Sequence, residues 1–138
     1  MERFSTSDIC KLFHIRPERL RDWIGRGFIC PSIPARGGGR PAVFFIADLY
    51  AIEVFLRLLK VGVSRDVASE ITVICFNDEK VEKVTWLLLI FKNDKKPALI
   101  AFDKFAQLEK SIKVNQITTS ILINFSNIKK KVKNRIKP

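Results

Sequence analysis

The sequence has few of the residues that build metal centres, disulfide scaffolds and catalytic pairs. Its 138 residues include one histidine, His14, and three distant cysteines, Cys10, Cys30 and Cys75. The cysteines lie far apart, are odd in number and form no Cys-x-x-Cys pair. This argues against both a disulfide scaffold and a zinc module. An enzyme would need a nucleophile with a neighbouring base, or a pair of carboxylates, and one histidine with scattered acids supplies neither. We therefore expect no enzymatic activity, no metal site and no cofactor.

Long apolar segments are also missing. The apolar run Trp86–Phe91 is far too short to cross a bilayer, because a membrane-spanning helix needs about 20 apolar residues. The start of the chain, Met1-Glu2-Arg3, has no apolar stretch behind it and so gives no secretory signal. We expect a soluble, cytoplasmic protein with reduced thiols and no membrane partner.

Acidic residues are scarce relative to basic ones. The chain has 14 Asp and Glu against 25 Lys and Arg, which gives a formal net charge of +11. Such a surplus favours a polyanionic partner but does not identify it. Residues 1–75 hold nine Arg and two Lys, whereas residues 76–138 hold thirteen Lys and one Arg. Because Arg binds guanine edges and phosphates through two hydrogen bonds and Lys acts as a point charge, the two parts are predicted to have different roles.

The first part, residues 1–75, is predicted to be helical around a glycine-rich hairpin. Ser5 is the predicted N-cap of a first helix. Pro17 opens a second helix after a turn of about three residues, which is the spacing of a helix-turn-helix. The proline- and glycine-rich stretch 31–41 excludes a helix and favours a hairpin with a glycine tip. Apolar residues at helical spacing predict two further helices, over 47–61 and from 64 onward.

In the second part, residues 76–138, the spacing of the apolar residues indicates strands as well as helices. Residues 84–91 are nearly all apolar, which is typical of a strand buried on both faces. A hairpin loop over 92–97, a partner strand over 98–102, a short helix over 104–113, a third strand over 120–125 and a last helix capped by Ser126 complete the prediction. The fold class is α+β: an N-terminal four-helix winged helix-turn-helix over 1–75, then a small α/β module over 76–138 with about three strands and one or two helices. The module ends in a basic tail, 126–138.

The apolar strand leads to a prediction about assembly. The short helix over 104–113 can cover one face of the strand 86–91. We expect a second copy of the sheet to cover the other face, which makes residues 76–138 a homodimer interface. The alternative is that the first part of the same chain covers that face. The tail is expected to dock on the sheet, with phosphate contact as the next alternative and membrane binding as a distant third.

The second helix carries the residues that best suit DNA recognition. Its buried stripe includes Trp23, and its exposed side presents three arginines with Asp22 among them. Arg can bind guanine in the major groove, and a carboxylate can accept from cytosine or hold an arginine in place. The alternative is an exposed helix with Arg19–Asp22 and Asp22–Arg26 ion pairs only. Hydroxyls of the first helix, the hairpin arginines and two further cations complete the predicted DNA-binding set: Thr6, Ser7, Arg16, Arg19, Arg21, Asp22, Arg26, Arg36, Arg40 and Lys60.

Four short motifs in order resemble the DNA-binding domain of the MerR (mercury-resistance regulator) family. The family shows Leu-Arg-Tyr-Tyr-Glu and Gly-Leu around its second helix, a Gly-rich wing with arginine, an Asp-Leu helix opening and a Gly-x-Ser step. The similar segments here are Leu20-Arg21-Asp22-Trp23-Ile24 with Gly27-Phe28, Arg36-Gly37-Gly38-Gly39-Arg40, Asp48-Leu49 and Gly62-Val63-Ser64. The resemblance covers residues 4–75. The long helix through which family members dimerise is replaced by the strands and helices of 76–138, which resemble no family.

The resemblance implies a sequence-specific, double-stranded DNA-binding transcription regulator. With the dimer prediction above, it acts as a homodimer on nucleoid DNA, because pairing two reading heads over two half-sites supplies useful specificity. An excisionase-like or other architectural DNA-binding protein of a phage or mobile element is the alternative. A module whose basic surface binds a protein is a third class. The sequence identifies no effector ligand.

Overall fold

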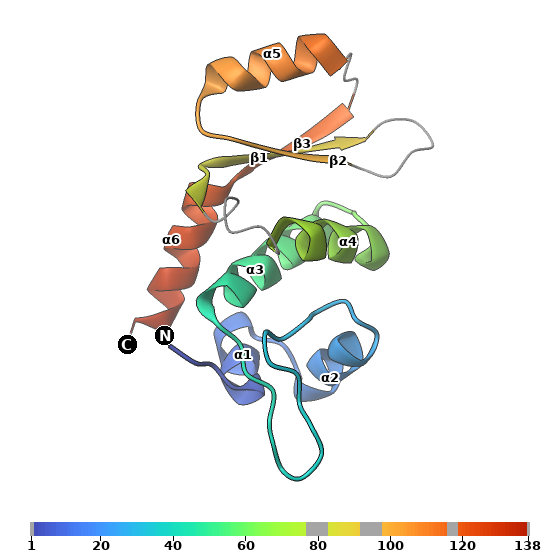
Figure 1. Ribbon diagram of the computed structural model, residues 1–138, viewed down its shortest axis with the longest axis vertical. Coiled ribbons are helices and arrows are strands. Elements are labelled where there is room, and N and C mark those ends of the chain that lie inside the picture. Colours follow the sequence, from blue (N-terminus) through green and yellow to red (C-terminus); the bar gives the residue numbers. More distant parts are fainter. Residues whose placement is uncertain (1, 77–82, 92–97, 116–118, 138) are drawn as a thin grey trace.

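The chain folds into helices on both sides of a small antiparallel sheet (Figure 1). The computed structural model describes residues 2–76, 83–91, 98–115 and 119–137. Its elements are α1 (Thr6–Phe13), α2 (Pro17–Gly25), α3 (Ile46–Lys60), α4 (Arg65–Phe76), β1 (Trp86–Phe91), β2 (Ala98–Phe102), α5 (Phe105–Asn115), β3 (Thr119–Asn124) and α6 (Phe125–Ile136). The predicted α+β class is confirmed. The loop predicted over 92–97 lies outside the described residues.

Local signals set the ends of the first two helices. The Ser5 hydroxyl accepts a hydrogen bond from the Asp8 amide at 3.1 Å, and the Asp8 carboxylate accepts from the Ser5 amide at 2.8 Å. This capping box satisfies amide groups at the start of α1. His14 ends α1 in the left-handed conformation, with a φ of 55°. Pro17 occupies the first turn of α2, where its missing amide hydrogen costs nothing.

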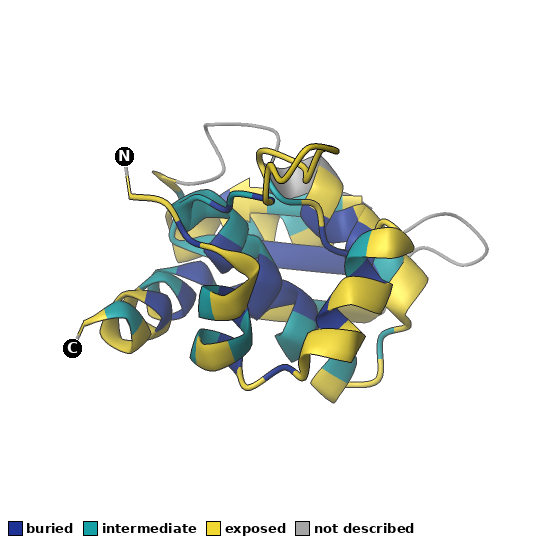
Figure 2. Ribbon diagram, turned by 90° about the horizontal axis from the view of Figure 1, so that it is seen from below, coloured by how far each residue is buried: buried dark blue, intermediate teal, exposed yellow. Residues whose placement is uncertain are grey.

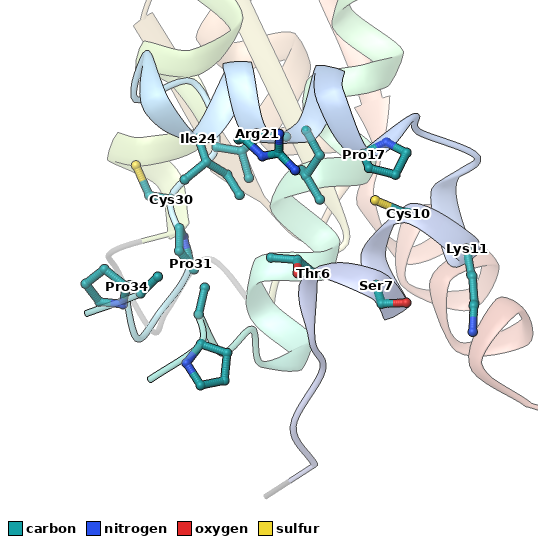
Figure 3. Close-up of a pocket in the computed structure, with 15 residues that line it drawn as sticks. Thr6, Ser7, Cys10, Lys11, Pro17, Arg21, Ile24, Cys30, Pro31 and Pro34 are labelled. Atoms are coloured by element: carbon teal, nitrogen blue, oxygen red, sulfur yellow. The ribbon is translucent and has the colours of Figure 1, made fainter. Parts of the chain in front are cut away.

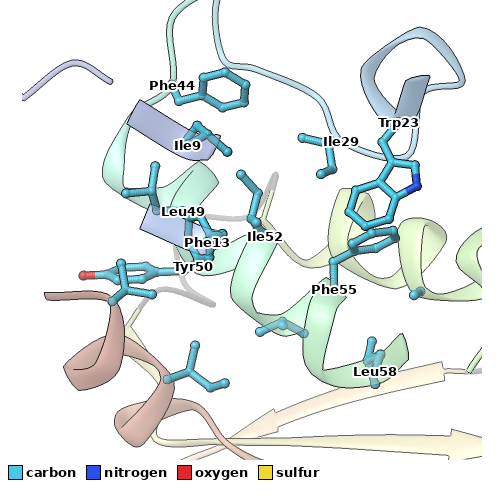
Figure 4. Packing of buried hydrophobic residues seen from close by; sticks show 14 of the residues in the cluster. Ile9, Phe13, Trp23, Ile29, Phe44, Leu49, Tyr50, Ile52, Phe55 and Leu58 are labelled. Atoms are coloured by element: carbon cyan, nitrogen blue, oxygen red, sulfur yellow. The ribbon is translucent and has the colours of Figure 1, made fainter. Parts of the chain in front are cut away.

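Helices α1 to α4 share one hydrophobic core, and α3 contributes the most buried residues to it. Trp23 of α2 meets Phe55 of α3 edge to face, with ring centroids 5.3 Å apart. Ile9 of α1 and Phe44 before α3 are both completely buried in the same cluster (Figure 4). Trp23 is therefore a core residue, as the sequence predicted. The packing fixes α2 against the rest of the head, by which we mean residues 4–76.

The sheet has the strand order β2-β1-β3, with both neighbours antiparallel to β1. Leu87 and Leu89 of β1 belong to the same core cluster as α3. Leu88 and Ile90 point to the other face, where Leu108 of α5 packs against them. Figure 1 shows α5 on one side of the sheet and α3 with α4 on the other. Both faces of β1 are thus covered within one chain, so the expectation that a second copy of the sheet covers the other face was wrong, and the alternative, cover by the first part of the same chain, was right.

Helix α6 follows β3 directly and packs on α3. The Asn124 side chain accepts a hydrogen bond from the Asn127 amide at 3.1 Å, so Asn124 is the N-cap in place of the predicted Ser126. Phe125 is completely buried and meets Tyr50 of α3 edge to face at 5.9 Å. The tail therefore docks on the head as well as on β1. One core cluster runs across the predicted boundary between residues 75 and 76.

None of the helices in the described part of the chain is both long and apolar enough to span a membrane.

Candidate DNA-binding surface

A groove of about 1020 Å³ lies between α1, α2 and the hairpin that follows α2 (Figure 3). Its polar groups come from α1 and α2, and its remaining lining is mostly apolar. The lining residues are Thr6, Ser7, Cys10, Lys11, Pro17, Leu20, Arg21, Ile24, Ile29, Cys30, Pro31, Pro34, Ala35, Pro41 and Ala42. Cys10 and Cys30 are free thiols.

Arg21 enters the groove from α2. Pro17, Arg21 and Ile24 are spaced by four and three residues, so they share one side of the helix, and all three line the groove. On the α1 side lie Thr6 and Ser7, both exposed residues. Ser5 is the residue that caps the helix, so neither of their hydroxyls serves as the cap. The structure thus brings three predicted residues from two helices to one concave surface.

The other arginines of α2 have different surroundings. Arg26 forms an ion pair with Asp22, with Nε and Oδ1 3.1 Å apart, which is one of the two pairs considered from the sequence. Arg19 lies over the Trp23 ring at 5.7 Å instead of pairing with Asp22. Because residues two apart point to different sides of a helix, Arg19 lines a second hollow of about 490 Å³, together with Arg16. Arg16 and Arg19 therefore do not share the groove with Arg21.

The hairpin forms the wing, residues 31–43. Ile33 pairs with Val43, and the Arg36 amide donates to the Arg40 carbonyl at 2.9 Å. Between the arginines, Gly38 and Gly39 have φ angles of 82° and 81°, a backbone region that residues with a Cβ rarely adopt. The two arginine side chains are exposed at this tip, and Figure 1 shows the wing standing out below α1 and α2.

Asp48 holds the base of the wing. Its Oδ2 accepts from the Ser32 amide at 3.1 Å, from the Ser32 hydroxyl and from the Phe45 amide at 2.9 Å. The last bond also satisfies an amide at the start of α3. One carboxylate therefore joins the wing to the helix that carries the core. The sequence marked Asp48 as a family motif but not as the residue that positions the wing.

Two cations complete the account of the predicted residues. Lys60 is exposed at the last position of α3 and does not line the groove. Lys11 lines the groove but was not predicted, although its spacing of four residues from Ser7 places both on one side of α1. Among the described residues, no acid pairs with Arg21, Arg36 or Arg40. Their charges are thus open to an outside anion.

Two helices joined by a short turn, followed by a glycine-tipped hairpin, define a winged helix-turn-helix DNA-binding domain. A comparison with protein-family models agrees: the MerR HTH family regulatory protein model matches residues 4–72, half of the chain. The chain belongs to this family, and is thus a DNA-binding transcription regulator. No curated protein sequence matches the chain.

Proposed function

We propose that the protein reads a specific double-stranded DNA sequence, with Arg21 at base edges and the wing at the backbone. The observation that carries this proposal is the groove, which brings an unpaired arginine together with two hydroxyls of α1. Arg donates two hydrogen bonds to guanine in the major groove, and Thr or Ser hydroxyls bind phosphate or base edges. The aliphatic and proline side chains beside Arg21 suit contact with thymine methyl groups.

The wing has the chemistry of a backbone contact. Arg36 and Arg40 are exposed on either side of a tip that has no side chains, so the main chain can approach phosphates closely. Groove and wing together present cations, hydroxyls and apolar groups, a combination suited to binding a polyanion. The proposed role is accordingly binding without catalysis, on nucleoid DNA in the cytoplasm.

We also propose that the protein acts as a homodimer through the α5 side of the sheet. Phe105 and Ile112 lie on one side of α5 but stay 56% and 37% exposed. Leu122 pairs with Leu88 in the sheet, so it lies on the same face, and it is 41% exposed. Exposed large apolar side chains on one side of a sheet are typical of an interface. A two-fold dimer would place two heads over two half-sites.

Selection of bound sequences from a random duplex pool tests the proposal. We expect the selected site to be two-fold symmetric. We also expect a dimer in sedimentation equilibrium, which Leu122→Ser converts to a monomer. Enrichment of tandem sites with DNA bending would favour an architectural role. A pool with no enriched sequence would refute specific reading.

A further inference from the structure

Arg135, in the last turn of α6, joins the C-terminal module to the helix-turn-helix. Its Nη1 donates a hydrogen bond to the Leu12 carbonyl oxygen at 2.8 Å. Its guanidinium carbon lies 5.6 Å from the centre of the Phe13 ring. Its Nη2 is 3.9 Å from Oε2 of Glu53 on α3. One side chain thus bridges three helices, and Figure 2 shows α6 running beside α1.

The contact with α1 is made where the helix-turn-helix bends. Leu12 and Phe13 are in the last turn of α1, and His14 begins the turn that leads to Pro17 and α2. Carbonyl groups at a helix end lack partners within the helix and carry negative partial charge. A guanidinium at this place therefore satisfies the Leu12 carbonyl and holds the point from which α2 departs.

Glu53 fixes the guanidinium from the other side. Its side chain is only 2% exposed, and its Oε1 accepts from Arg57 Nε at 3.1 Å. A buried carboxylate needs partners for both oxygens, since an unpaired buried charge is costly. Arg57 serves one oxygen from the same helix, and Arg135 faces the other from α6. This arrangement restrains where the end of α6 can lie.

We propose that Arg135 is a positioning residue for DNA reading, which sets the orientation of α1 and α2 without contacting DNA. Because α6 follows β3 without a linker, the same contact makes the orientation of the head depend on the sheet. The inference rests on the proposed DNA binding and adds to it a residue far from the groove.

The test compares Arg135→Ala with Lys133→Ala in the full chain. Lys133 is exposed in the same turn of α6, so its loss removes an equal charge. Affinity for a selected duplex is measured over a series of salt concentrations, and amide hydrogen exchange is measured without DNA. We expect Arg135→Ala to weaken binding about tenfold with an unchanged salt slope, whereas Lys133→Ala weakens it less. Exchange should rise in α1 and α2 but not in α5 for Arg135→Ala only.

Two results would overturn the inference. One is unchanged affinity in Arg135→Ala; the other is a loss accompanied by a salt slope shallower by about 0.9, which would place Arg135 on a phosphate. If Arg135→Ala does not fold, Arg135→Lys decides, since it keeps the charge but loses the planar fork. Exchange in α1 and α2 equal to that of the wild type would then refute the bridge. Absence of salt-dependent duplex binding by the wild type would instead refute the proposed function, and the exchange measurement would still test Arg135.

Discussion

Replacing Phe125 with alanine should destabilise the head and the sheet together. Phe125 opens α6, is completely buried and packs edge to face on Tyr50 of α3. Lys129 Nζ also lies 5.0 Å from the centre of its ring. These contacts place an aromatic ring from the lysine-rich part of the chain inside the core of the head. Its removal leaves a cavity that both parts share.

The expected size of the effect follows from complete burial. A Phe→Ala change in a core costs about 3–5 kcal/mol, the transfer free energy of the ring plus the cavity left behind. Domains have a total unfolding free energy of about 5–15 kcal/mol, so the loss is a large fraction. For a chain of this length, the Tm should fall by roughly 10–20 °C. Val61→Ala is the control, since Val61 is 63% exposed at the end of α3 and its loss should cost far less.

The two tryptophans allow each part to be followed separately. Trp23 lies in α2 and Trp86 in β1, and they are the only two in the chain. Urea unfolding followed by fluorescence in Trp86→Phe reports on the head, and in Trp23→Phe it reports on the sheet. Adding Phe125→Ala should lower both midpoints by the same amount, because a shared core unfolds as one unit. A shift in the Trp86 signal with none in the Trp23 signal would refute the shared core.

Three further predictions concern DNA. The logarithm of the binding constant should fall linearly with the logarithm of salt, by about 0.9 per phosphate contacted, and a flat line would argue against electrostatic binding. Arg21→Ala should cost about 1–3 kcal/mol in binding free energy and relax the preference at one base position. Arg26→Ala should have a smaller effect, because Arg26 is already paired with Asp22. Equal losses for all sequences in both variants would place Arg21 on phosphate. Asp48→Ala should lower the unfolding free energy by about 2 kcal/mol in urea titrations and weaken binding to all sequences, because the wing loses its anchor; wild-type affinity would show that the wing is held by other contacts.

Local signals made the head predictable from the sequence. A capping serine, a proline in the first turn and a run of three glycines each determine the backbone within a few residues, so the helix-turn-helix and the wing were placed correctly. The burial of Trp23 followed from its place in the apolar stripe of α2. The family match agrees with the motifs found in these segments.

Contacts between distant residues were not predictable in the same way. The uninterrupted apolar sequence of β1 shows that both faces of the strand must be covered, but it does not show which elements cover them. Here α3, α4 and α6 cover the face opposite α5. The link from Arg135 to Leu12 joins residues at opposite ends of the chain, and no local pattern indicates it. The same holds for the bond from Ser32 to Asp48, since the intervening wing has to fold before the two meet.

The two parts of the chain differ in their charged surface residues, arginine in the first and lysine in the second, but they share one hydrophobic core. The lysines of α6 lie between and after Ile128 and Val132, which are buried in the same cluster as the core of the head. A fragment ending at residue 75 would therefore expose the side of α3 that α6 covers and lose the guanidinium at the end of α1. The arginine-rich part thus carries the groups suited to DNA, while the lysine-rich part completes the core that holds them in place.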